Sequence, residues 1–407
     1  MTRPRGPLAG PDPTASPGDQ PSDQPSDIAA TGRQGSEELR GLAAAAGFDD
    51  CRVAAAADAP GFAKLAQWLE AGYGGTMEYI AGRLPAYRHP EGVQPGCRSV
   101  IMLLTSYNHP DLRPTSPVQP GRGRVASYAA SGVDYHDLLH SRMKSLIATL
   151  RQRRPEGTFR GVVDTAPLLE RDFARLAGLG WVGKNTMLLS RRWGSYFLLS
   201  AVLTDLTLEP DSPFEADHCG SCTRCLDACP TDAFAAPRVL DATRCISYLT
   251  IENRGAAPGD LRAAVGDWAF GCDICQDVCP WNRKAEVASG EALAPTPVFQ
   301  ELDLVELLRM DEDTFRRRFR RSPMWRGKLL GMQRNSLLVL GNQRAATALS
   351  DIVRFLDHES PMLRLSAAYA LGRIGGPAAI GSLQVRLAIE ADAAVRREIT
   401  EAIADPA

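Results

Sequence analysis

The sequence has no apolar stretch of membrane-spanning length, and its N-terminus has no apolar core of the signal-peptide kind. We therefore expect a cytoplasmic protein without membrane contact. A strong net charge is also missing, because 46 Lys and Arg residues nearly balance 48 Asp and Glu residues and the formal net charge is −2 at pH 7. No overall field attracts nucleic acid, so any nucleic-acid site has to be a local patch. A chain of 407 residues predicts two or three domains.

Large apolar residues are almost absent from the first 35 positions, which are dense in Pro, Gly, Ser, Asp and Gln. Such a segment buries too little apolar surface to offset the entropy lost on ordering, so a disordered tail is expected over 1–35. The remaining chain is divided by its patterns into an α/β domain at 36–210, a cysteine-rich ferredoxin-like module at 211–290, and a basic linker with HEAT-like helical repeats at 291–407.

Strand and helix patterns alternate through residues 36–210, which indicates the α/β domain. The run Ser99–Ser106 is continuously apolar, as in a strand buried on both faces of a sheet. Segments Leu337–Gly341 and Ala368–Gly372 match at a spacing of 31 residues (368 − 337), and a third helix pattern, Ala393–Ala404, follows at a similar step. Paired helices at this period predict the HEAT-like array, either as a binding surface or as a purely structural bundle.

Eight cysteines have a spacing that is typical of iron–sulfur proteins. A C-x2-C-x2-C-x3-C-P run extends from Cys219 to Pro230, its second half recurs from Cys272 to Pro280, and Cys245 lies between. In this pattern three thiolates bind one cubane and the fourth binds another, so we expect two 4Fe–4S clusters. The ferredoxin rule assigns Cys219, Cys222, Cys225 and Cys279 to cluster one, and Cys229, Cys245, Cys272 and Cys275 to cluster two.

Structural zinc and disulfides are the alternatives for these cysteines. Zinc sites use C-x2-C pairs, but two C-x3-C-P endings are not a zinc spacing. Disulfides suit small secreted domains rather than a chain of this size without a secretion signal. The remaining Cys51 and Cys97 are expected to be small buried apolar residues.

Residues 316–328 hold seven Arg or Lys, interleaved with Phe319 and Trp325. Basic side chains neutralise phosphates and aromatic rings stack on unpaired bases, so this stretch indicates RNA binding. The alternative is a solvated helix face balanced by the acidic residues at 311–313, and Arg334 just beyond favours RNA.

Asp164 begins a helix-like pattern that has Pro167 in its first turn and Gly178 as its stop, so the residues alone favour Asp164 as a helix cap. A role as an acid requires a raised pKa, which a helix N-terminus opposes. His136 and His140 lie four residues apart, as at metal sites, but no further ligand joins them, so ordinary histidines are expected. The glycines of Gly178–Gly183 follow a helix, unlike a dinucleotide loop, and are expected to let the backbone approach a large flat ligand.

Several motifs together resemble epoxyqueuosine reductases over residues 36 to about 375. The motifs are Asp164-Thr-Ala-Pro with Glu170-Arg171, Ala177-Gly-Leu-Gly-Trp-Val-Gly-Lys-Asn185, Asp134-Tyr-His136, Cys245-Ile-Ser-Tyr-Leu-Thr250, and Gly271-Cys-Asp-Ile-Cys275 with Cys279-Pro-Trp-Asn282. The resemblance implies a cobalamin-dependent enzyme in which two 4Fe–4S clusters supply electrons. It implies reduction of epoxyqueuosine to queuosine at the wobble position of tRNA, with an anticodon stem-loop as substrate and a low-potential donor such as a flavodoxin or ferredoxin.

The resemblance also implies roles for individual residues. The α/β domain would bind cobalamin, and Asp164 would be the proton donor. Cobalamin contacts would fall on Arg88, Ser127, Asp164, Leu188, Ser247 and Asp273, and RNA contacts on Arg326, Lys328 and Arg334. Two departures concern this site: the family arginine near position 87 is displaced, which makes Arg88 the candidate, and Ser200-Ala201 stands where relatives tend to have Gly-Glu.

Two other functions fit parts of the pattern. A reductive dehalogenase also combines cobalamin with two ferredoxin clusters, but it would carry a twin-arginine export signal and would not need the basic aromatic stretch. A non-catalytic ferredoxin fused to an RNA-binding module would carry electrons without cobalamin.

Overall fold

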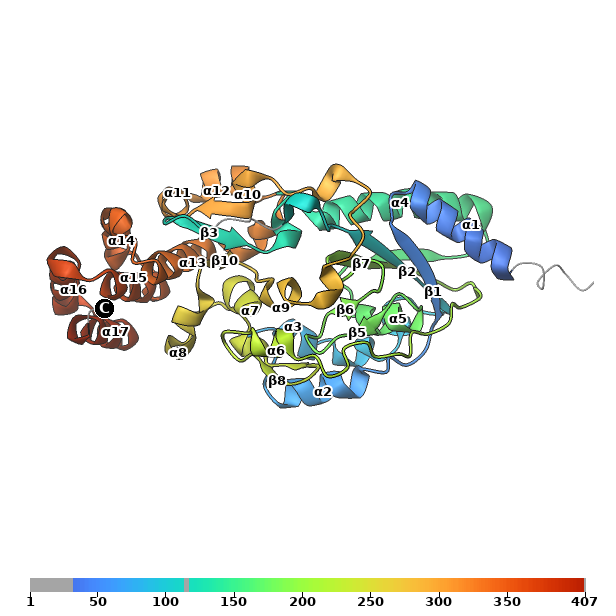
Figure 1. Cartoon of the computed structure of the whole chain (residues 1–407), viewed down its shortest axis with the longest axis horizontal. Coiled ribbons are helices and arrows are strands. Elements are labelled where there is room, and N and C mark those ends of the chain that lie inside the picture. Colours follow the sequence, from blue (N-terminus) through green and yellow to red (C-terminus); the bar gives the residue numbers. More distant parts are fainter. Residues whose placement is uncertain (1–31, 113–116, 406–407) are drawn as a thin grey trace, which may run out of the picture.

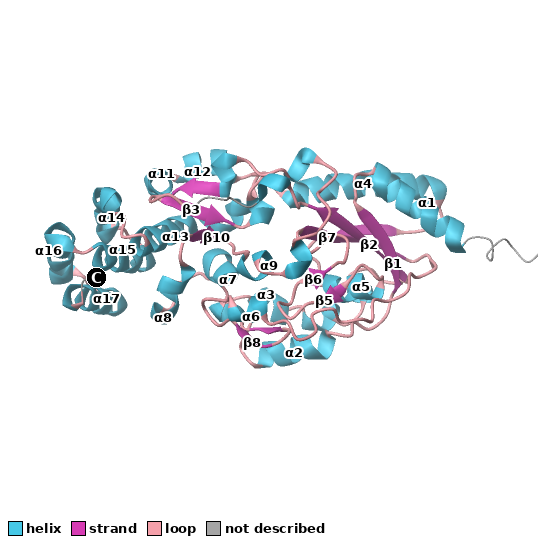
Figure 2. Ribbon diagram, in the orientation of Figure 1, coloured by secondary structure: helices cyan, strands magenta, loops and turns pink. Residues whose placement is uncertain are grey.

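A computed structural model describes residues 32–112 and 117–405 (Figure 1). The molecule is elongated, with the helical repeats at one end and a four-stranded sheet at the other (Figures 1 and 2). The predicted tail of residues 1–35 lies outside the described residues except for its last four positions, which begin a helix, α1 (Gly32–Ala45). Among the described residues no helix is both long and apolar enough to cross a membrane.

The N-terminal part is built on an antiparallel sheet in the order β1-β2-β7-β4. Its strands are β1 (Asp50–Ala55), β2 (Ser99–Ser106), β7 (Phe197–Thr204) and β4 (Phe159–Val162). Every residue of β2 is buried, as its apolar run predicts. Alternation of strands and helices is most familiar from parallel sheets, but here each pair of neighbours is antiparallel.

Two separate cores explain why β2 is buried on both faces. On one face Ile101 and Leu103 pack with residues of α1 and of α4 (Tyr135–Arg153). On the other face Val100, Met102 and Leu104 pack with Phe173 and its neighbours in α5 (Glu170–Leu176). Helices therefore cover both faces, as the α/β interpretation requires.

A second sheet joins all three predicted regions of the chain. Its order is β10-β3-β11, and its strands are β3 (Arg122–Val125), β10 (Trp268–Phe270) and β11 (Glu301–Asp303). Strand β3 belongs to the N-terminal region, β10 to the cysteine module and β11 to the C-terminal region. One large core continues across these strands, from Val125 through Phe270 and Leu302 into the helical repeats. The division at 210 and 290 stays a prediction, and the three regions pack as one body.

The cysteine module has short elements between long loops. They are α6 (Arg224–Asp227), β8 (Phe234–Ala236), β9 (Val239–Leu240), α7 (Ile246–Ile251), α8 (Gly259–Arg262) and α9 (Ile274–Asp277). The C-terminal region is helical apart from β11. Its main helices are α10 (Pro297–Gln300), α11 (Leu304–Arg309), α12 (Glu312–Phe319), α13 (Lys328–Asn342), α14 (Leu349–Val353), α15 (Pro361–Ile374), α16 (Gly376–Ile389) and α17 (Ala393–Ala404).

In the matching segments of the repeats, alternate helices approach each other closely at a glycine. Gly341 on α13 faces Ala370 on α15, and a Cβ at Gly341 would lie 2.8 Å from the Ala370 Cα. Gly372 on α15 faces Ala402 on α17 in the same way, because a Cβ added at Gly372 would lie 2.6 Å from the Ala402 Cβ. The predicted array is confirmed, and its repeated glycine is explained by close backbone approach.

Gly341→Ala is expected to lower the free energy of unfolding by about 1–3 kcal/mol, because backbone atoms of α15 have to move. The matched control is Gly331→Ala on the same helix, where an added Cβ meets nothing within 4 Å. That control is expected to be neutral or to stabilise by up to about 1 kcal/mol, since alanine favours helix. Urea unfolding of both variants measures the difference, and equal midpoints would contradict the packing argument.

Candidate active site and iron–sulfur centres

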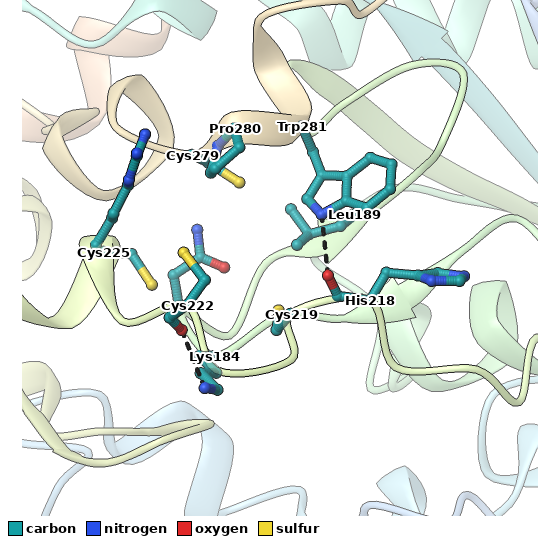
Figure 3. Close-up of a pocket in the computed structure, with 11 residues that line it drawn as sticks. Lys184, Leu189, His218, Cys219, Cys222, Cys225, Cys279, Pro280 and Trp281 are labelled. Atoms are coloured by element: carbon teal, nitrogen blue, oxygen red, sulfur yellow. Dashed lines mark hydrogen bonds between the residues drawn. The ribbon is translucent and has the colours of Figure 1, made fainter.

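Four thiols line a cavity of about 240 Å³ between the cysteine module and residues 184–189 of the N-terminal region (Figure 3). They are those of Cys219, Cys222, Cys225 and Cys279, the set predicted for cluster one. The sulfurs of Cys222, Cys225 and Cys279 point into the same space, and Leu189 and Trp281 form apolar walls (Figure 3). Cys279 comes from the second motif, so the structure brings together ligands that lie more than fifty residues apart in the sequence.

The spread of the four thiols around the cavity favours a cluster over a single zinc ion. Four zinc ligands converge to about 2.3 Å from one point, which requires tightly grouped side chains. In the described part of the chain no group of three or more His, Cys, Asp or Glu side chains converges in that way. Four thiols spread around a cavity instead suit a cubane, whose irons are separate ligand positions.

The second predicted set is also close together. Burial raises the pKa of the Cys245 thiol, and the negative charge of Cys229 raises it further. Burial raises the pKa of Cys275 well above its usual value, with Cys245 and Cys229 among the neighbours that add to the effect. Burial, together with the negative charges of the nearby Cys275 and Cys245, also raises the pKa of Cys272 well above its usual value. Buried thiols that repel one another as thiolates need a cation to neutralise them, which iron supplies.

All ten cysteines lie within the described residues, and none of them forms a disulfide. Cys51 and Cys97 are buried, as expected. Burial raises the pKa of Cys51 to about 12, so this thiol is an unreactive apolar residue.

The glycine-rich loop has a structural role. It forms a hairpin between β5 (Trp181–Val182) and β6 (Leu188–Leu189), and a Cβ at Gly180 would lie 1.9 Å from the Leu189 carbonyl oxygen. Gly178 and Gly180 therefore admit the chain's own backbone, and the approach of a flat ligand to this loop stays a prediction. The loop also braces the clusters: Lys184 Nζ donates to the carbonyls of Gly220 (2.7 Å) and Cys222 (2.9 Å).

A second cavity of about 250 Å³ lies between the N-terminal region, the cysteine module and the basic stretch. Its wall includes Tyr128, Tyr135 and Tyr248, three aromatic residues. Three residues predicted for the site, Asp164, Ser247 and Arg326, also line it. Cys245, a predicted ligand of cluster two, lines the same cavity. Mostly apolar walls with a few polar groups are typical of cofactor sites.

Asp164 is not a helix cap. Helix α5 begins at Glu170 with Leu169 at its N-cap position, and Asp164 has a left-handed backbone with φ of 54°. The Asp164 N–H donates to Glu170 Oε1 at 2.8 Å, which holds this backbone in place. Because Pro167 and the capping-type residues imitate a helix start, the sequence predicts the helix cap at Asp164, five residues before the observed cap at Leu169.

The Asp164 carboxylate is surrounded by donors that the sequence did not identify. Tyr135 Oη donates to Asp164 Oδ2 at 2.9 Å, and His136 Nε2 lies 3.2 Å from the same oxygen. His136 Nδ1 lies 2.8 Å from Asp134 Oδ1, and Arg326 Nη2 lies 2.7 Å from His136 Nε2. His136 is thus neither an ordinary core histidine nor part of a metal pair with the exposed His140.

These contacts decide the charge of the pair. The hydrogen bond with His136 is the main cause that lowers the pKa of Asp164, helped by Tyr135 and Arg326. Burial works to lower the pKa of His136, but its bonds to Asp134 and Asp164 raise it overall. Burial raises the pKa of Glu170 to about 8, so this neighbour is neutral near pH 7. The raised pKa expected for an acid at Asp164 is therefore not found in the free protein.

The other predicted cofactor residues fall into three places. Ser127 and Asp273 are buried and bond to each other, with the Ser127 N–H 2.6 Å from Asp273 Oδ2. Leu188 is buried in β6. Arg88 is exposed and pairs with Asp58 at 2.9 Å, away from the second cavity, whereas Arg83 donates to the carbonyl of Thr165 beside Asp164. Cofactor contacts at Ser127, Leu188, Asp273 and Arg88 stay predictions, and Arg83 is bonded to the residue that follows Asp164.

The predicted RNA residues are partly corrected. Arg334 is 3% exposed, and its guanidinium donates to the carbonyls of Leu249, Asn253 and Gly255, so it braces the end of α7 and cannot meet RNA. Phe319 is wholly buried and offers no stacking surface. Lys328 is exposed with its Nζ 4.7 Å from the Trp325 ring, and Arg326 is 39% exposed at the cavity.

Comparison with known proteins agrees with this arrangement. The family model "Epoxyqueuosine reductase QueG, DUF1730" matches residues 88–165, "4Fe-4S double cluster binding domain" matches 218–282, and "HEAT repeats" matches 331–404. Epoxyqueuosine reductases of Cyclobacterium marinum and Pseudomonas aeruginosa are each 40% identical, over 71% and 77% of this chain and 91% and 87% of theirs.

Solved structures give the same result. A crystal structure of epoxyqueuosine reductase with an epoxyqueuosine-modified tRNA-Tyr stem loop has a TM-score of 0.84 and 32% identity, covering 91% of this chain and 98% of that one. The Bacillus subtilis enzyme, solved with its catalytic aspartate loop swung out of the active site, has a TM-score of 0.82 and 31% identity, covering 91% and 99%. By the length and the level of these matches, the chain belongs to the epoxyqueuosine reductase family.

Proposed function

We propose that this protein reduces epoxyqueuosine to queuosine in tRNA, with electrons passing through two 4Fe–4S clusters to cobalamin in the second cavity. One observation carries the proposal: Asp164 and Cys245 line the same cavity. A cluster ligand and a proton donor therefore face one reaction space. Membership of the family supports the substrate, since a relative has been solved with an epoxyqueuosine-modified tRNA stem loop.

The residues of the second cavity fit cobalamin. The large flat ring system suits the aromatic wall of Tyr128, Tyr135 and Tyr248, and Ser247 is a polar contact beside Cys245. Cobalamin would supply a reduced, strongly nucleophilic cobalt that no side chain can imitate.

The chain itself supplies binding and protons. Opening the epoxide and forming the alkene consumes two electrons and two protons and releases the oxygen as water. Asp164 would protonate the departing oxygen, because it lines the cavity and its backbone N–H is bonded to Glu170. Arg326, which lines the cavity, and the exposed Lys328 two residues further on would hold RNA phosphates.

The partners follow from this chemistry. A low-potential carrier such as a flavodoxin or ferredoxin would reduce the clusters, with tRNA as the second partner. We place the protein in the cytoplasm, where its tRNA substrate is found. The dehalogenase and electron-carrier alternatives lose their support, because the family resemblance extends over the HEAT repeats and the Asp164 loop as well as the cysteine module.

A nucleoside digest of tRNA from a strain lacking this gene tests the proposal. Epoxyqueuosine is expected to accumulate and queuosine to disappear, and the wild-type gene is expected to restore queuosine. A deletion strain with normal queuosine would refute the assignment.

A further inference from the structure

Both ring nitrogens of His136 face a carboxylate oxygen. Nδ1 lies 2.8 Å from Asp134 Oδ1, and Nε2 lies 3.2 Å from Asp164 Oδ2. An ionised carboxylate can only accept hydrogen bonds, so each contact needs a proton on the ring nitrogen. A neutral imidazole carries one proton and satisfies one contact, whereas an imidazolium satisfies both. The geometry therefore favours the doubly protonated ring.

Arg326 leaves both of these protons in place. Its Nη2 lies 2.7 Å from Nε2 and 3.2 Å from Nδ1 of His136, and these two distances place it over the face of the ring. It therefore does not need the lone pair of either nitrogen. Burial and the positive charge of Arg326 work to lower the pKa of His136, but the bonds to Asp134 and Asp164 raise it overall.

The Asp164 carboxyl group is ionised in the free protein, because the hydrogen bond with His136, helped by Tyr135, lowers its pKa. A general acid has to carry a proton when the departing oxygen needs it. The proton that Asp164 delivers must therefore be held on a neighbouring group.

The other neighbours of Asp164 are poor stores. Arg326 does not lose its proton, and burial raises the pKa of Tyr135, so the phenol keeps its proton as well. Glu170 has a pKa of about 8 and is protonated near pH 7, but its contact is with the Asp164 N–H and not with the carboxylate. His136 is the neighbour that both touches the carboxylate and can release a proton near neutral pH.

The start of α4 holds this ring in place. Asp134 caps the helix by accepting from the His136 N–H at 3.0 Å, and its own N–H donates to the Arg321 carbonyl at 2.7 Å. The His136 side chain is 9% exposed, whereas that of Asp164 is 51% exposed and lines the second cavity. A proton that passes from His136 to Asp164 therefore moves toward the reaction space.

We propose that His136 is the proton store of the active site, an imidazolium that loads Asp164 during the reaction. The Nε2–H bond breaks, the proton passes to Asp164 Oδ2 and from there to the departing oxygen, and Asp164 is again a carboxylate. The neutral ring then takes one proton from solvent, and a second passage completes the water molecule. No electron moves in these steps. His136 is a positioning residue that acts through Asp164, and the inference rests on the proposed function.

The first test is imidazole ¹⁵N NMR of the oxidised holoenzyme, in which His136→Gln identifies the His136 signal among six histidines. At pH 6.5, the ordinary midpoint of a histidine, His136 is expected to be protonated on both nitrogens. Asp134→Asn keeps a helix-capping residue but removes the charge, so it is expected to lower the midpoint by about one pH unit or more. Asp164→Asn is expected to act in the same direction and identifies the signal if His136→Gln does not fold. A ring with a single proton at pH 6.5 overturns the proposal.

The second test is single-turnover conversion of modified stem-loop as a function of pH. The stored proton is present below the raised pKa of His136 and is lost above it, so the wild-type rate is expected to fall as pH rises through the midpoint seen by NMR. His136→Gln is expected to be about 10²-fold slower, to lose this dependence and to bind the stem-loop as wild type does. The matched control is His140→Gln, which removes an exposed histidine from the same helix and is expected to keep the wild-type rate and profile.

The outcomes separate the store from the reaction. A wild-type rate and pH profile in His136→Gln overturns the store alone, as does a loss of the pH dependence in Glu170→Gln but not in His136→Gln. Absence of conversion by wild type overturns the proposed function, whatever the protonation of His136.

Discussion

Asp164→Asn is expected to lower the rate of epoxyqueuosine reduction by about 10²–10⁴-fold, the usual contribution of a positioned general acid. Asparagine is the informative replacement, because it tolerates the left-handed backbone at φ of 54° and still accepts from Tyr135. It cannot deliver the proton. The measurement is single-turnover conversion of modified stem-loop, together with the absorbance of bound clusters and cobalamin.

The control for this variant is Asp164→Ala, which removes the carboxyl group and also strains the loop by about 1–3 kcal/mol. Both variants are expected to retain clusters and cobalamin, and the alanine variant to unfold at a lower temperature. If the asparagine variant lost cobalamin or its fold, Asp164 would be a structural residue and the proton-donor assignment would be wrong.

Cys245→Ser is expected to abolish turnover and to lower the iron content from about eight to about four atoms per chain, because cluster two loses a ligand. This position tests the proposal directly, because Cys245 belongs to the predicted ligand set of cluster two and also lines the second cavity. Iron and sulfide analysis with electron paramagnetic resonance of the reduced protein measures the loss.

Cys97→Ala is the matched control for Cys245→Ser. Cys97 is buried against the sheet, with only a weak contact of its thiol to the Ser99 carbonyl at 3.5 Å. Full iron content and turnover are expected there. Retention of both clusters in Cys245→Ser would overturn the ligand assignment, and loss of iron in Cys97→Ala would show that a general loss of stability explains both variants.

Features with a short-range signal were predicted well from the sequence. The continuous apolar run of β2, the spacing of the cysteines and the repeat of Gly341 and Gly372 each report a constraint that the local chain has to satisfy. The sequence also predicted that Cys279 groups with Cys219, because in the ferredoxin pattern the last cysteine of each motif binds the other cluster.

Features that depend on long-range packing were missed. Nothing local shows that His136 meets Asp164, twenty-eight residues away, since Asp134 to His136 also fits an ordinary helix start, and Asp134 does cap α4. A count of basic residues cannot separate Arg334, which is buried, from Lys328, which is exposed. The residues around Pro167 have the composition of a helix start, but they form a loop in which the Asp164 N–H donates to Glu170.

The three-stranded sheet has a consequence for how this protein can change over evolution. Because β3 lies between β10 and β11, each region supplies a strand that another region needs. Removing the C-terminal helices together with β11 would leave an open edge on β3, ready to pair with other chains. Exchanging the cysteine module, the N-terminal region or the helical array for a foreign module would therefore require a new partner strand as well.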